Sequence, residues 1–268
     1  MNRLTRRMDQ LKKQGAKAFV AYIMAGEPSW DRAESIICQL ERIGVSAVEL
    51  GVPFSDPIAD GPVIQAAANR ALAAGVTLEQ IFQRVSGLRK LTQLPILLMG
   101  YWNVFLQYGR QHCLEAARSA GVDGFIIPDL PPEADPEFFD LARKKDLCTV
   151  LLASELTPED RLKRIAATAS GFLYYVPQVG ITGLELTAGQ ALEERIRLIR
   201  SLTDTPICIG IGVKTREDAQ TLTRWADGVI VGTRIVDFIH QNAELPDLPQ
   251  ATARFVSELI PEAPLRQL

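Results

Sequence analysis

The sequence predicts a closed (β/α)₈ barrel, and three observations predict it. Short continuous apolar segments alternate with amphipathic helical segments, a pattern typical of a parallel sheet that is buried on both faces. Eight such pairs can be counted in 268 residues, a length usual for this barrel. No repeat, linker or low-complexity segment interrupts them, so we expect a single domain over residues 1–268. An open doubly wound sheet is the alternative that the same pattern permits.

The predicted strands are the short apolar segments. They are Ala18–Met24, Val45–Gly51, Pro95–Tyr101, Gly124–Pro128, Cys148–Ala153, Gly171–Val176, Pro206–Ile211 and Asp227–Val231. Amphipathic helices are expected after each strand, and Ser29 and Thr77 are N-cap residues of two of them. An extra helix is expected before the first strand, over Leu4–Leu11, and another at the carboxyl end, after a turn that contains Pro249.

Composition and charge exclude several classes of function and location. The formal net charge of −3 leaves no basic footprint, so nucleic acid and an acidic membrane surface are not expected partners. The four cysteines form no Cys-x-x-Cys pair, which favours free thiols and a reducing cytoplasm. No apolar segment is long enough for a membrane span, and the basic start lacks the apolar core of a signal peptide. A small molecule is the expected ligand.

Carboxylates gather where the second predicted strand ends. Glu49 lies near the end of that strand, and Asp56 and Asp60 lie in the long Gly- and Pro-rich loop that follows. In such barrels the carboxyl ends of the strands form the active site. Glu49 has a structural alternative, in which it caps a helix or pairs with an arginine. For Asp60 the residue pattern favours a turn or N-cap residue, and Asp129 is the acid most readily explained as a turn residue or as part of a partner surface.

A second group of candidates is rich in glycine. Gly180–Gly183 follows the sixth predicted strand, Gly210–Gly212 ends the seventh, and Gly232 with Thr233 ends the eighth. Their backbone N–H groups, with the N-terminus of the last helix of the barrel, are suited to bind a phosphate, and strand ends six to eight are the usual phosphate position in these barrels.

Metal and Schiff-base chemistry are not indicated. His112 and His240 have no metal-ligand spacing, and Lys214 lies at a polar helix start where solvation is the ordinary outcome. Bond cleavage is therefore expected to depend on general acid–base catalysis by carboxylates. A glutamate at the mouth of an apolar barrel would have its pKa raised by desolvation, so that it can both give and take a proton near neutral pH.

Four segments together resemble the tryptophan synthase alpha chain family. They are Glu49–Pro62, Gly121–Pro132, Gly180–Gly183 and Ala226–Gly232, and the similarity runs from about Ala18 to Phe238. The resemblance implies reversible retro-aldol cleavage of indole-3-glycerol phosphate to indole and glyceraldehyde 3-phosphate, with no cofactor in this chain. It also implies a beta-chain partner that carries pyridoxal phosphate and receives the indole, in an alpha2beta2 tetramer.

The resemblance also assigns roles to residues. Glu49 protonates the indole ring carbon and removes the proton of the adjacent hydroxyl, while Asp60 holds the indole N–H. Tyr174 lies close to Glu49. The remaining matches are Tyr22 and Met99 in the indole slot, Gly183, Gly212, Gly232 and Thr233 around the phosphate, Thr182 in a loop that closes over Asp60, and Asp56 on the face that meets the beta chain. Core packing is the alternative for Tyr22 and Met99.

The chain departs from the family pattern at a few positions. Pro177 stiffens the base of the loop after strand six, and Ile211 stands where an aromatic residue is usual. Thr233 replaces the usual serine and keeps its hydroxyl. Arg234 replaces a small residue, and either a charge-assisted phosphate contact or a solvent-facing position is consistent with the sequence. Two rivals stay open: a regulatory subunit that has lost cleavage, and an enzyme that releases free indole without a partner.

Overall fold

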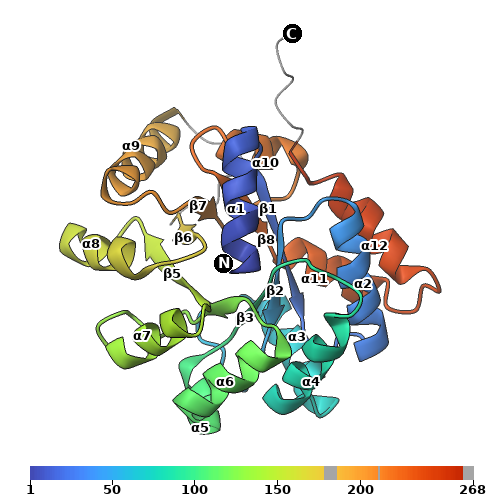
Figure 1. Cartoon of the computed structure of the whole chain (residues 1–268). Helices are drawn as coiled ribbons and strands as arrows, with labels where there is room; N and C mark the ends of the chain where they lie inside the picture. The colour runs from blue at the N-terminus through green and yellow to red at the C-terminus, as the bar shows by residue number, and fades with distance from the viewer. Residues whose placement is uncertain (178–185, 211, 262–268) are drawn as a thin grey trace.

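Eight parallel strands close into a barrel in the order of the sequence, as the computed structural model in Figure 1 shows. The structure describes residues 1–177, 186–210 and 212–261. The barrel closes because β1 pairs with both β2 and β8. The predicted barrel is therefore confirmed over the open sheet. The strands are β1 Ala18–Met24, β2 Ala47–Gly51, β3 Ile96–Met99, β4 Gly124–Ile126, β5 Cys148–Ser154, β6 Leu173–Val176, β7 Ile207–Ile209 and β8 Gly228–Val231.

Helices surround the barrel, with an extra helix before the first strand and another at the carboxyl end, as expected. In the described chain they are α1 Arg3–Gln14, α2 Trp30–Arg42, α3 Pro62–Ala73, α4 Leu78–Leu88, α5 Trp102–Tyr108, α6 Arg110–Ala120, α7 Pro136–Lys144, α8 Glu159–Thr168, α9 Leu186–Leu202, α10 Arg216–Leu222, α11 Thr233–Gln241 and α12 Leu248–Ser257. Ser29 and Thr77 accept the expected N-cap hydrogen bonds. α12 begins with Pro249 in its first turn, where a missing N–H costs nothing.

Strand alternation separates the core into two layers. Side chains of one parity point outward and pack under the helices, as Phe19 and Leu50 do. Side chains of the other parity fill the barrel, and Val20, Ala47 and Tyr174 belong to this inner cluster. The period of two therefore directs Tyr174 toward the barrel axis.

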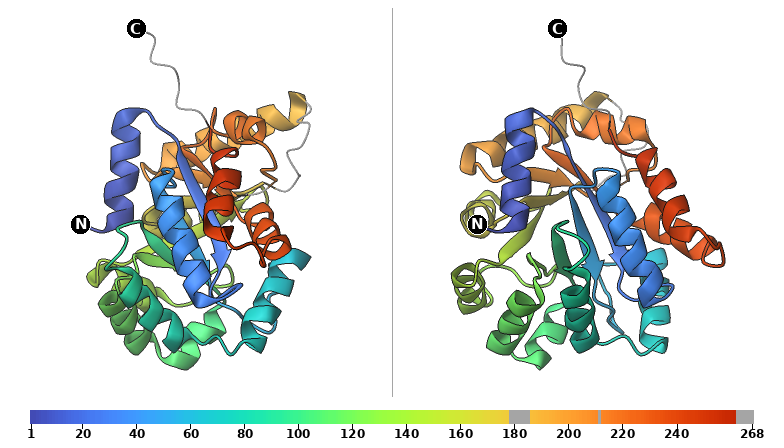
Figure 2. Two further views of the ribbon diagram at one scale, coloured as in Figure 1. Left: turned by 90° about the vertical axis from the view of Figure 1, so that its right-hand side faces the viewer. Right: turned by 45° about the vertical axis from the view of Figure 1, so that its right-hand side comes forward.

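Helix α1 closes the amino-terminal end of the barrel. Its Leu4, Met8 and Leu11 pack into the inner cluster, and Figure 2 shows the helix lying across one end of the barrel. Polar contacts fix it there: the Asn2 amide donates to the carbonyl of Asp123 at 2.7 Å. Together these contacts leave the opposite end, where the strands terminate, as the open one.

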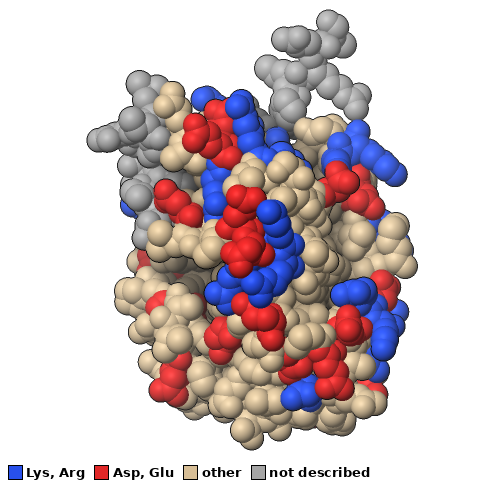
Figure 3. All heavy atoms as spheres, turned by 90° about the vertical axis from the view of Figure 1, so that its left-hand side faces the viewer, with Lys and Arg blue, Asp and Glu red and all other residues tan. Residues whose placement is uncertain are grey.

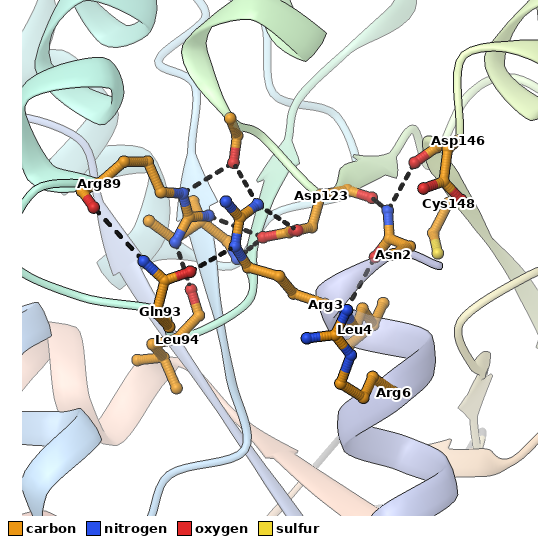
Figure 4. Close-up of polar contacts among 12 residues, drawn as sticks. Asn2, Arg3, Leu4, Arg6, Arg89, Gln93, Leu94, Asp123, Asp146 and Cys148 are labelled. Carbon is orange, nitrogen blue, oxygen red and sulfur yellow. Dashed lines mark hydrogen bonds and ion pairs between the residues drawn. The ribbon is translucent and has the colours of Figure 1, made fainter.

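A buried carboxylate organises these contacts (Figure 4). Asp123 is 1 % exposed, accepts a hydrogen bond from the N–H of Ile96, and pairs with Arg89 at 2.7 Å and with Arg3 at 3.1 Å. The ion pairs and hydrogen bonds of this carboxylate offset the free-energy cost of removing its charge from water. The burial of Asp123 is therefore explained by its structural role. Asp123 directly precedes β4, at the end of the barrel opposite the carboxyl ends of the strands.

The face over α7, α8 and α9 carries acids and bases side by side (Figure 3). Within α8, Lys163 pairs with Glu159 and Arg164 pairs with Asp160. Such mixed pairing provides no single-sign surface for nucleic acid on this face. Within the described ranges, no helix is long and apolar enough to span a bilayer.

Candidate active site

A cavity of about 480 Å³ opens at the carboxyl end of the barrel. Its wall combines apolar side chains, two carboxyl groups and a set of strand-end glycines. It includes most of the site residues predicted from the sequence: Tyr22, Glu49, Asp60, Met99, Tyr174, Gly210, Gly212, Gly232 and Thr233. Thr182 and Gly183, like Ile211, lie outside the described residues. A cavity of this size and mixed lining is typical of a small-molecule site.

Glu49 has no partner for its carboxyl group. The side chain is 1 % exposed, and neither oxygen has a hydrogen-bond partner among the described residues. The alternative in which Glu49 caps a helix or pairs with an arginine is therefore wrong. Burial raises the pKa of Glu49 to about 8, so the carboxyl group is mainly protonated at neutral pH. An unpaired buried acid that faces a cavity is a candidate for proton transfer.

Asp60 lies in the loop between β2 and α3 and does not cap the helix. Gly61 occupies the N-cap position of α3 without a side-chain hydrogen bond, so the N-cap interpretation of Asp60 is wrong. Its backbone does form a turn, since its N–H donates to the carbonyl of Pro57 at 3.0 Å. Burial raises the pKa of Asp60 above its ordinary value, and a hydrogen bond from the Tyr101 side chain opposes that rise. The side chain is left facing the cavity.

Tyr101 connects the acidic loop to the end of β3, a role that the sequence analysis missed. Its hydroxyl accepts from the N–H of Ala59 at 2.9 Å, and its ring stacks on Phe54 with centroids 5.4 Å apart. Both contacts come from the β2–α3 loop. The signal was present in the sequence, because Tyr101 ended a predicted strand at the rim where site residues are expected.

Tyr174 lies between the acids and the glycine-rich side of the cavity. Its hydroxyl donates to the carbonyl of Gly210 at 3.4 Å. A side chain at position 210 would displace Tyr174, because a Cβ there would lie 2.3 Å from the phenol ring and hydroxyl. Burial, with Glu49 and Asp60 nearby, raises the pKa of Tyr174 well above its usual value, so the phenol stays protonated.

Part of the cavity wall is apolar. Tyr22 is paired in register with Glu49, and its hydroxyl approaches Gly51 so closely that a Cβ would lie 2.1 Å away. Met99 is paired with Gly51 across β2 and β3. Further apolar residues that the sequence analysis did not single out are Ile64, Leu152, Val176 and Ile230. This part of the wall is suited to an apolar group of a ligand.

The glycine-rich side is formed by the ends of β7 and β8. Gly210 and Gly212 follow β7, and Gly232 is the N-cap residue of α11, with Thr233 as its first residue. The N–H of Gly210 donates to the carbonyl of Tyr175 at 3.1 Å, so Gly212, Gly232 and the N-terminus of α11 are the backbone groups that border the same cavity as the acids. This arrangement is suited to an anionic group such as a phosphate.

The remaining candidate residues have structural contacts. Asp129 lies in a turn in which the N–H of Leu130 donates to the carbonyl of Ile127 at 3.1 Å, as its structural alternative predicted. Its side chain also accepts from the N–H of Trp102 at 2.8 Å at the start of α5. His112 stacks on Tyr108, and His240 lies 3.9 Å from Glu27. The portion of the chain that the structure describes contains no group of three or more His, Cys, Asp or Glu residues suited to a metal ion.

Fold and site together are those of a (β/α)₈-barrel enzyme whose cavity is suited to acid–base chemistry on a small molecule. Comparison with known proteins gives the family. The family model for the tryptophan synthase alpha chain matches residues 8–259. The chain therefore belongs to the tryptophan synthase alpha chain family, and it is an alpha-subunit lyase of tryptophan biosynthesis.

Relatives and solved structures agree. The tryptophan synthase alpha chain of Citrifermentans bemidjiense is 43% identical over 250 residues, which are 91% of this chain and 92% of that protein. The crystal structure of tryptophan synthase subunit alpha from Legionella pneumophila has a TM-score of 0.89 and 35% identity, covering 97% of both chains. A tryptophan synthase complex from Pyrococcus furiosus contains a similar chain, with a TM-score of 0.81, 33% identity, and coverage of 90% and 97%. The resemblance inferred from sequence is confirmed.

Proposed function

We propose that this chain cleaves indole-3-glycerol phosphate to indole and glyceraldehyde 3-phosphate, with Glu49 as acid–base residue and Asp60 as its electrostatic partner. The observation that carries the proposal is the buried carboxyl group of Glu49, which has no described partner and faces a cavity shared with Asp60. The apolar slot accommodates the indole ring, and the strand-end glycines border the phosphate.

The proton balance of the reaction suits one carboxyl group. Glu49, protonated at neutral pH, gives its proton to indole C3. The bond from C3 to the side-chain carbon then breaks, and its electron pair returns to the ring as the positive charge on nitrogen is lost. The carboxylate takes the proton of the hydroxyl on that side-chain carbon, which becomes the aldehyde. Asp60 accepts the indole N–H and stabilises the charge that develops on the ring.

Tyr174 and the glycines hold the substrate between these groups. The phenol of Tyr174, kept protonated by burial, lies near Glu49 and donates to the carbonyl of Gly210 at 3.4 Å. Backbone N–H groups at Gly212, Gly232 and Thr233 are the proposed phosphate ligands. Gly210 lines the same wall, but its N–H donates to the carbonyl of Tyr175 at 3.1 Å. The roles of Tyr22 and Met99 are to enclose the indole, and Thr182 and Gly183 complete the set by resemblance alone.

The decisive test is Glu49→Gln in an indole-release assay with indole-3-glycerol phosphate. The amide keeps the shape but cannot exchange the proton, so we expect turnover to fall at least about 10³-fold with the fold intact by circular dichroism. Glu34→Gln, an acid on α2 that pairs with Arg84, is the matched control. Near-normal turnover of Glu49→Gln would end the assignment. An inactive parent chain that still activates a beta chain would support the regulatory rival.

We further propose a beta-chain partner that carries pyridoxal phosphate, in an alpha2beta2 tetramer, and a cytoplasmic location. Apolar side chains that follow three strand ends support a docking face at the carboxyl end of the barrel. Ile58 after β2 is 86% exposed, Leu106 after β3 is 40% exposed and Leu156 after β5 is 70% exposed. Asp56 lies in the same loop as Ile58. Exposed apolar groups gathered on one face indicate a protein interface.

Assembly is tested by mixing the chain with a pyridoxal phosphate-containing beta chain and measuring mass by analytical ultracentrifugation. Ile58→Asp should weaken the complex. Leu91→Asp should not, because Leu91, although also exposed and apolar, precedes the amino end of β3. An indole assay with and without the beta chain separates transfer of indole from its free release. Equal assembly of both variants would remove the Ile58 face from consideration.

A further inference from the structure

Two cations border the glycine-rich side of the cavity. Lys214 follows β7 and Arg234 lies in the first turn of α11, and both contribute to the wall that contains Gly212 and Gly232. Each side chain is exposed, so it can reach a ligand at the mouth without loss of burial. They come from the two strand ends that also supply the proposed phosphate ligands.

Neither cation is neutralised by a described acid. Lys214 and Arg234 form no ion pair or side-chain hydrogen bond with any residue that the structure describes, whereas the nearby Arg254 on α12 pairs with Asp247 at 2.8 Å. The lysine backbone is held in place, since its N–H donates to Asp218 at 2.9 Å. The backbone that carries the lysine is therefore held in place, and the charge on its side chain is unpaired among the described residues.

The guanidinium of Arg234 is held by an aromatic stack. Its central carbon lies 5.5 Å from the ring centroid of Phe255, and Phe255 stacks on Phe238 with centroids 4.3 Å apart and planes 7° from parallel. Stacking holds the face of a guanidinium while its edge N–H groups stay available for two parallel hydrogen bonds. This arrangement lowers the entropy lost when an anion binds.

We propose that Lys214 and Arg234 bind the phosphate of the substrate as a pair of charged ligands, so that this chain recognises a phosphate monoester dianion by charge and not by backbone N–H groups alone. The inference rests on the proposed function for the identity of the substrate, but the binding of the anion is measurable without it. Charge-assisted hydrogen bonds are stronger than neutral ones, and their contribution falls with salt.

The test is isothermal titration of the full chain with glycerol 3-phosphate and with inorganic phosphate. The proteins are the parent chain, Lys214→Gln, Arg234→Gln, the double variant, and Arg254→Gln as the matched control. Each single variant should weaken glycerol 3-phosphate binding about threefold to tenfold, and the double variant more than about tenfold. Raising the salt concentration should weaken binding by the parent chain more than binding by the double variant. The control should bind as the parent does.

Kinetics separates this inference from the proposed reaction. With indole-3-glycerol phosphate, the two cation variants should raise KM while kcat stays within about twofold, because the phosphate is remote from the bond that breaks. If the parent chain binds the anion but does not cleave the substrate, and the cation variants bind the anion more weakly, the inference stands and the proposed function is overturned. Binding within twofold of the parent by the double variant, with unchanged salt dependence, would overturn the inference.

Discussion

The hydroxyl of Tyr101 accepts a hydrogen bond from the backbone N–H of Ala59 at 2.9 Å, one residue before Asp60. The same side chain hydrogen-bonds to Asp60 and stacks on Phe54. The end of β3 thus holds the loop that carries the second carboxylate. The position of Asp60 therefore depends on Tyr101, which lies 41 residues further along the chain.

Tyr101→Phe is expected to lower kcat for indole release about 5- to 30-fold. The ring still stacks on Phe54, but the loss of the hydroxyl releases Ala59 and Asp60, and a misplaced catalytic group is costly. Steady-state kinetics measures the effect. Tyr108→Phe, which removes a hydroxyl bonded to exposed Glu79, is the control and should not change kcat. Equal rates for both variants would show that Tyr101 does not position Asp60.

Activity should fall as the pH rises through about 8. Glu49 must be protonated to give its proton to the ring, and burial raises its pKa to about 8, so the active form is lost above that value. Asp60 must be ionised, and its pKa is also raised, so the acid limb reports its protonation. The measurement is log(kcat/KM) against pH. Asp60→Asn should remove the acid limb while the alkaline limb stays.

The stability of Glu49→Gln relative to the parent should increase with pH. Glu49 ionises near 4.5 in the unfolded chain and near 8 in the fold, so the folded state binds more protons between these values and the parent loses stability as pH rises. The slope is at most about 1.4 kcal/mol per pH unit. Glutamine does not titrate. Urea unfolding at pH 5 and pH 8 checks this, and a constant difference between the two proteins would contradict it.

Gly210→Ala should damage the site more than the fold. The added Cβ would lie 2.3 Å from the Tyr174 ring, which must move away from Glu49. We expect indole release to fall at least tenfold and the free energy of unfolding to fall by about 1–3 kcal/mol. Gly87→Ala, within α4, is the control, because an added Cβ there would lie in open space. That variant should be active and slightly more stable.

Asp123→Asn should lower stability without changing chemistry. The substitution leaves Arg89, whose side chain is only 10% exposed, without its charged partner. Removing one member of a buried pair costs about 3–5 kcal/mol, whereas Asp140→Asn, which breaks an exposed pair with Arg143, should cost less than about 0.5 kcal/mol. Thermal and urea unfolding measure the difference. Both variants should release indole at the parent rate at 25 °C, because Asp123 lies at the opposite end of the barrel.

Local patterns were sufficient for the barrel and for most of the site. The period of apolar segments predicted all eight strands, and the rule that parallel strands end on one side placed Glu49, Tyr174 and Gly232 at one rim. Family resemblance chose between the structural and functional interpretations of Asp60. The structure removed the N-cap alternative for that residue and confirmed the structural one for Asp129.

What the sequence determined by itself is the order of elements and the strand end at which each candidate residue lies, because hydrophobic period and turn residues act over a few positions. What only the tertiary structure decided is which side chains lack partners. Glu49 is unpaired and Asp123 is doubly paired, although both are buried acids in strand regions. The difference arises from arginines distant in sequence, whose approach depends on how α1 and α4 pack at the closed end of the barrel. Pairing and desolvation are set by such long-range contacts, and with them the pKa that makes Glu49 suited to its reaction.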